Sequence, residues 1–133
     1  MQKLFFSLFS LFVLVTNTNA QQKDTYPVVV SFNSMCCGVP SNEPVMKFIK
    51  AFKKQYKIKK LSVDSIGPMG KEGEYYLAFR LKELSKTQRV KFIQHLKKIV
   101  PTMKEQGSAD VKENETIDKA SLSSRASVTL IKL

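Results

Sequence analysis

Three segments of the chain arrange apolar residues in the way that β-strands do. Residues 26–32 are β-branched and apolar on both faces, which predicts a strand in the middle of a sheet. Residues 59–66 and residues 74–82 both alternate apolar and polar positions, the second more regularly than the first. Because a connector rich in Gly and Pro joins these two segments at residues 67–73, they predict a hairpin.

Two other segments repeat apolar residues at helical spacing. The first follows a capping Ser41 or Asn42 and runs to Tyr56, and the second spans residues 85–100 and stops at Pro101. The apolar stripe expected on the first consists of Val45, Phe48, Ile49, Phe52 and Tyr56. The stripe expected on the second consists of Val90, Ile93, Leu96 and Val100. We therefore expect two amphipathic helices that pack against a sheet.

The stretch at residues 102–125 is polar, which predicts a long loop with at most a weak edge strand near residues 109–111. Residues 126–131 predict a final strand. The resulting order predicts an α+β domain with the ferredoxin-like βαββαβ fold, in which two helices lie on one face of a four-stranded antiparallel sheet. In the alternative arrangement, the strand near Ala109 is the fourth strand and the C-terminal strand adds an extra edge.

The first twenty residues have the three parts of a secretory signal peptide. Lys3 gives a positive start, residues 4–15 are apolar, and small residues stand at Thr18 and Ala20. The apolar run is shorter than the roughly 20 residues that a membrane span needs, and no later segment reaches that length. We therefore expect cleavage near Ala20 and export to the periplasm or the extracellular space. The mature chain, residues 21–133, is expected to be one domain without a transmembrane span.

The chain is strongly basic, with 22 Lys and Arg against 11 Asp and Glu. Cleavage of the leader removes one lysine and no acid, which leaves a net charge of about +10. This charge favours anionic partners such as lipid head groups, surface polysaccharide or an acidic protein. Since lysine greatly outnumbers arginine, and base recognition relies on arginine, we expect no nucleic-acid partner.

Many of the lysines gather on the side of the first expected helix that lies opposite its apolar stripe. This lysine face consists of Lys47, Lys50, Lys53, Lys54 and Lys57. In one interpretation the face only keeps the protein soluble. In the other it docks to an unknown protein or to an anionic component of the cell envelope.

The two cysteines of the chain, Cys36 and Cys37, are adjacent and lie between the first expected strand and the first helix. A disulfide between neighbours is strained, because their Cα atoms lie about 3.8 Å apart and disulfides usually span about 4.4–6.8 Å. Four interpretations stay open: ordinary small residues, one or both of them buried; a soft-metal site; a redox pair or strained regulatory disulfide; and a bridge to another molecule.

The loop Met35-Cys36-Cys37-Gly38 resembles the metal-binding loop of the heavy-metal-associated domains, small ferredoxin-like modules that carry Cu(I) and similar ions. Those domains place a Met-x-Cys-x-x-Cys loop between the first strand and the first helix. Here the second cysteine of the pattern would fall near Val39, which cannot bind a metal. The resemblance implies that Cys36 and Cys37 are thiolate ligands of Cu(I) or another soft metal, with Met35 as a packing residue or third ligand.

The sequence has no Ser-His-Asp pattern, no phosphate-binding glycine loop and no paired carboxylates at useful spacing, which favours a non-enzyme without a cofactor. The leading hypothesis is an exported, non-catalytic basic binding module. It would engage an anionic or protein partner through the lysine face or the cysteine loop. The alternative is a thiol-based soft-metal carrier or redox protein that uses Cys36 and Cys37.

Overall fold

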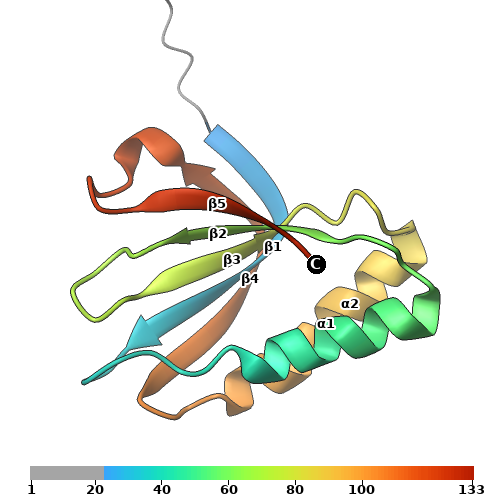
Figure 1. Ribbon diagram of the computed structural model, residues 1–133, viewed down its shortest axis with the longest axis horizontal. Coiled ribbons are helices and arrows are strands. Elements are labelled where there is room, and N and C mark those ends of the chain that lie inside the picture. Colours follow the sequence, from blue (N-terminus) through green and yellow to red (C-terminus); the bar gives the residue numbers. More distant parts are fainter. Residues whose placement is uncertain (1–22) are drawn as a thin grey trace, which may run out of the picture.

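The computed structural model describes residues 23–133, so the predicted signal peptide and its cleavage site lie outside the described residues. This part of the chain forms one five-stranded antiparallel sheet and two α-helices (Figure 1). The elements in chain order are β1 (Lys23–Ser34), α1 (Glu43–Tyr56), β2 (Ser62–Gly67), β3 (Tyr75–Phe79), α2 (Lys86–Ile99), β4 (Gly107–Asp118) and β5 (Ser127–Lys132). One 3-10 turn, Val100–Thr102, follows α2, and another, Lys119–Ser121, follows β4.

The strand order across the sheet is β4-β1-β3-β2-β5, so the predicted four-stranded ferredoxin-like sheet is wrong. The predicted loop at residues 102–125 is also wrong for about half its length, because β4 occupies Gly107–Asp118 and pairs with β1 along nearly all of it. The alternative with a strand near Ala109 and an extra C-terminal edge strand agrees with this order. An edge strand is held by its backbone hydrogen bonds and can carry mostly polar side chains, so the hydrophobic pattern underestimates β4.

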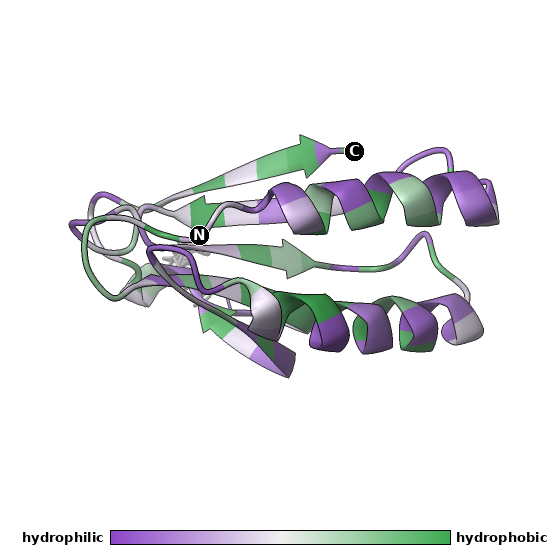
Figure 2. Ribbon diagram, turned by 90° about the horizontal axis from the view of Figure 1, so that it is seen from below, coloured by the Kyte–Doolittle hydropathy of each residue, from purple (hydrophilic) through white to green (hydrophobic). Residues whose placement is uncertain are grey.

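Both helices cover the same face of the sheet, and the main core lies between them and the strands (Figures 1 and 2). The stripe predicted for α1 is confirmed: four of its residues are buried, and Tyr56 packs at the margin of the core. The stripe predicted for α2 is partly wrong. Phe92 and Leu96 are its buried residues, whereas Val90 is 54% exposed.

The packing of Phe92 explains why α2 turns a different side toward the core from the one predicted. Its ring lies 5.0 Å from the Phe48 ring, 5.2 Å from the Phe52 ring and 5.4 Å from the Phe79 ring, measured between centroids. A phenylalanine removes more apolar area from water than a valine does, so burying Phe92 instead of Val90 is favourable. Neither helix, nor any other helix within residues 23–133, is long and apolar enough to cross a membrane.

Candidate functional site

Helix α1 carries the lysine face, and local signals in the sequence fix where it begins. Pro44 stands in the first turn, where its missing amide hydrogen costs nothing. The backbone amide of Glu43 donates to the Ser41 hydroxyl at 3.2 Å. The Glu43 carboxylate also lies near the positive end of the helix dipole and pairs with the Lys47 ammonium at 2.8 Å.

The helix ends at Tyr56, and the capping residue Lys57 adopts the left-handed conformation with φ 53°. Lys53 and Lys54 lie in the last turn, where cations interact favourably with the helix dipole. Within residues 23–133, only Lys47 of the lysine face forms an ion pair. The positive charge of the other four lysines is therefore not neutralised by a neighbouring carboxylate in this part of the chain.

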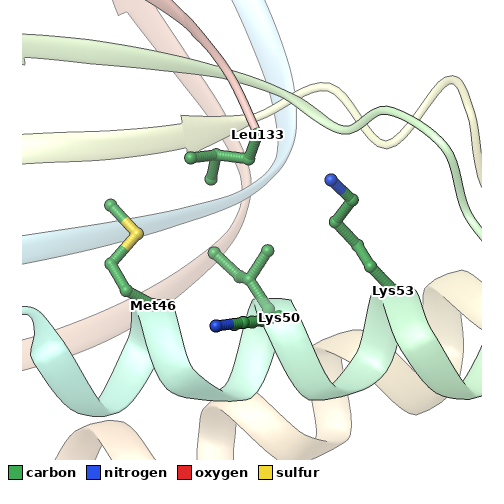
Figure 3. A pocket seen from close by; sticks show the side chains of 5 residues that line it. Met46, Lys50, Lys53 and Leu133 are labelled. Carbon is green, nitrogen blue, oxygen red and sulfur yellow. The ribbon is translucent and has the colours of Figure 1, made fainter.

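A groove of about 340 Å³ lies between α1 and the end of β5 (Figure 3). Its lining residues are Met46, Ile49, Lys50, Lys53 and Leu133. Met46 extends from α1 toward Leu133, and Lys53 extends from the next turns of the helix toward the same side (Figure 3).

Leu133 is held over α1 by backbone pairing with the chain just before β2. The Leu133 amide donates to the Leu61 carbonyl at 3.0 Å, and the Leu61 amide donates to the Leu133 carbonyl at 2.9 Å. Leu61 itself is fully buried in the main core. These paired backbone hydrogen bonds therefore anchor the apolar wall of the groove to the sheet.

The groove combines apolar side chains with two ammonium groups. Its volume lies at the lower end of the usual range for ligand pockets, about 300–1,000 Å³. Lysine buries its aliphatic stem against apolar surface and keeps the ammonium in water, which suits the positions of Lys50 and Lys53 at the groove. Chemically, the groove can hold a short apolar group beside an acidic one.

The cysteine loop lies between β1 and α1. The Cys36 and Cys37 side chains are both exposed, and their sulfur atoms lie 2.8 Å apart. Cys37 has φ 68°, and Gly38 follows with φ 125°, so the chain turns sharply at the pair. The interpretation of one or both cysteines as buried residues is wrong. The Met35 side chain is 80% exposed, so it does not pack in the core.

Two neighbours shape the chemistry of the pair. The hydrogen bond with the Cys37 thiol raises the pKa of the Cys36 thiol, and partial removal from water and the Glu72 carboxylate raise it further. Within residues 23–133, no three side chains of His, Cys, Asp or Glu come together to hold a metal. A soft-metal site formed by Cys36, Cys37 and Met35 stays a prediction.

Besides the groove and the cysteine loop, a polar cluster lies on the face of the sheet opposite the helices, and the sequence pattern did not reveal it. Asp64 is buried, and its carboxylate accepts from the Tyr26 hydroxyl at 2.7 Å and from the Arg80 guanidinium at 2.7 Å. Arg80 also donates to Asp24 at 3.0 Å, and Lys119 pairs with Asp24 at 2.7 Å. The donors and acceptors satisfy one another, which indicates a structural network.

This network perturbs two of its members. Burial and the hydrogen bond to Asp64 raise the pKa of Tyr26 well above its usual value of 10.0. Hydrogen bonds from Lys119 and Arg80 lower the pKa of Asp24 below its usual value of 3.8. Alternation along the two strands of the hairpin could have indicated that Asp64 and Arg80 face the same side, but not that β1 brings the Tyr26 hydroxyl against both of them.

The structure thus separates the residues that the sequence grouped. Lys50 and Lys53 line the groove, whereas Lys47, Lys54 and Lys57 do not. The spacing of Met46, Lys50 and Lys53 indicates one side of a helix, but only the course of β5 places Leu133 against it. Comparison with protein-family models, with curated proteins and with solved structures gives no match, so the resemblance to heavy-metal-associated domains stays a prediction.

Proposed function

We propose that this protein is a non-catalytic binding module for an anionic amphiphile, a molecule with an acidic head group and a single apolar chain. One observation carries the proposal: an apolar groove has two lysines, Lys50 and Lys53, that form no ion pair within residues 23–133. The apolar chain would lie against Met46, Ile49 and Leu133, and the acidic group would meet the two ammonium groups.

The energetics favour a ligand that uses both parts of the groove. Each lysine near an anionic group contributes about 1 kcal/mol, which is too little for an acidic group alone to bind tightly. An apolar chain adds about 25 cal/mol for each Å² that it removes from water. The small size of the groove therefore predicts modest affinity and a requirement for both the charge and the chain.

The remaining lysines have a different expected role. Lys54 and Lys57 lie outside the groove and carry no carboxylate partner among the described residues, so they raise the positive potential around it. Salt screens exposed charges over about 8 Å at physiological ionic strength. We therefore expect them to speed association and to make it depend on salt, without setting which ligand binds.

Calorimetric titration with monomeric dodecyl phosphate tests the proposal. Replacing both groove lysines, Lys50→Gln/Lys53→Gln, removes about 2 kcal/mol of attraction and should weaken binding roughly 10- to 30-fold. The matched control, Lys54→Gln/Lys59→Gln, makes the same change in net charge outside the groove and should weaken binding less than about threefold.

Two further ligands separate the proposed function from simpler ones. Inorganic phosphate lacks the chain and should bind far more weakly than dodecyl phosphate. The neutral dodecyl maltoside lacks the acidic group and should also bind weakly. If dodecyl phosphate binds the two double variants with equal affinity, the proposed role of the groove is contradicted. If the native chain binds dodecyl maltoside as tightly as dodecyl phosphate, recognition of the anion is contradicted.

A further inference from the structure

The exposed cysteine pair has a chemistry that binding of an amphiphile does not use. Cys36 and Cys37 lie at the surface with their sulfur atoms 2.8 Å apart, so closure to a disulfide of about 2.05 Å needs only a small movement. Their exposure lets a second molecule reach either sulfur. A buried pair would have been protected from such an encounter, and a distant pair could not have closed.

We propose that Cys36 and Cys37 form a dithiol exchange site, which reduces small disulfides of the glutathione class and closes to a disulfide between the two neighbours. One thiolate attacks a sulfur of the external disulfide, forms a mixed disulfide and releases the first thiol. The other thiolate then attacks the protein sulfur of the mixed disulfide and releases the second thiol. The protein loses two electrons and two protons, and the external disulfide takes up both.

The covalent geometry makes this closure reversible. Adjacent Cα atoms are about 3.8 Å apart, below the roughly 4.4–6.8 Å of ordinary disulfides, so the closed ring is strained. Strained and exposed disulfides are the ones that thiols reduce readily. A stable structural staple is therefore not expected here, and the pair should pass between its open and closed forms under mild conditions.

The backbone around the pair favours closure over a bridge to another molecule. Cys37 already adopts φ 68°, and Gly38 adopts φ 125°, a conformation that residues with a Cβ rarely take. The turn holds the two sulfurs together before any reaction, so the second attack is intramolecular. An intramolecular attack has a far higher effective concentration than a second protein molecule in dilute solution.

Intact mass measurement after thiol exchange tests the proposal on the full chain. The protein is reduced, freed of reductant, treated with oxidised glutathione at low protein concentration and then quenched with excess N-ethylmaleimide at neutral pH. The native chain should give a monomer that has lost two hydrogens and carries no label. Reduced glutathione alone should then restore the form that accepts two labels.

Single substitutions trap the intermediate. Cys36→Ser and Cys37→Ser each lack the second attacking sulfur, so each should retain one glutathione as a mixed disulfide. Both positions are exposed, and far-UV circular dichroism checks that the variants fold. A native chain that retains glutathione, forms disulfide-linked dimers or stays fully reduced would overturn the proposal. If reduced glutathione does not reopen the closed form, the claim that closure is reversible is contradicted.

Discussion

Replacing Arg80 with methionine should destabilise the protein strongly, although Arg80 lies at the surface of the sheet. Its guanidinium is the cation that contacts Asp64, at 2.7 Å, and the Asp64 side chain is only 5% exposed. Methionine keeps much of the aliphatic length of arginine and removes the charge. The Asp64 carboxylate would then keep the hydrogen bond from Tyr26 but would lose its counter-charge.

The magnitude follows from the burial of the two partners. Removing one partner of a buried ion pair costs about 3–5 kcal/mol, because the other charge is left uncompensated. The Arg80 side chain is 30% exposed, so water can reach part of the space that it leaves, and we expect the lower end of that range, about 3 kcal/mol. For a domain of this size, this corresponds to a fall in Tm of roughly 10–20 °C.

Urea unfolding followed by far-UV circular dichroism measures this loss, with two companion variants. Lys82→Met removes an exposed cation that has no ion pair within residues 23–133, and it should change the free energy of unfolding by no more than about 0.5 kcal/mol. Adding Asp64→Asn to Arg80→Met removes the buried charge but keeps an acceptor for Tyr26. The double variant should recover at least about 1 kcal/mol relative to Arg80→Met alone.

Equal costs for Arg80→Met and Lys82→Met would refute the reasoning, since they would mean that Asp64 does not depend on its partner. A double variant less stable than Arg80→Met would refute it in another way. In that case the carboxylate would contribute favourably without the guanidinium, and the packing of the Arg80 stem rather than its charge would explain the loss.

Other predictions concern pH and thiol reactivity. Because Lys119 and Arg80 lower the pKa of Asp24, its contribution to stability is present above pH 3.8 and is lost as the pH falls through the lower folded-state pKa. Asp24→Asn should therefore destabilise the protein at neutral pH, and its difference from the native chain should shrink in acid unfolding curves. The neighbouring thiol, removal from water and the Glu72 carboxylate raise the pKa of Cys36. Glu72→Gln removes one of these causes, so more of the Cys36 thiol is ionised at pH 8 and its alkylation should be faster, by a few-fold at most. Slower alkylation would contradict this assignment.

The sequence was sufficient where local pattern decides structure. The apolar stripe of α1 recurs every three or four residues, and the alternation at residues 74–82 follows the period of a strand, so both elements could be located before the structure was known. The same logic placed Val90 in the core, because it lies three residues before Ile93, another member of the predicted stripe. Competition for burial with the larger Phe92 decided the orientation of α2, and that competition depends on the facing Phe48 and Phe79.

Elements and sites that depend on distant partners could not be predicted in this way. The strand β4 is recognisable by its pairing with β1, which lies about 80 residues earlier in the chain. The groove needs Leu133 to return over α1, and the ionic network needs three strands to bring Tyr26, Asp64 and Arg80 together. No local sequence window contains that information. The adjacency of the cysteines was visible in the sequence, whereas their exposure depended on the course of the loop.

The most direct test of the proposed function is an NMR titration of the methionine methyl groups with monomeric dodecyl phosphate. Met46 lines the groove, whereas Met103 is buried in the main core and Met35 is exposed in the cysteine loop. The groove predicts a saturable shift of the Met46 methyl signal, with the Met103 and Met35 signals nearly unmoved. An unmoved Met46 signal, or an equal shift at Met35, would contradict binding of the amphiphile in the groove.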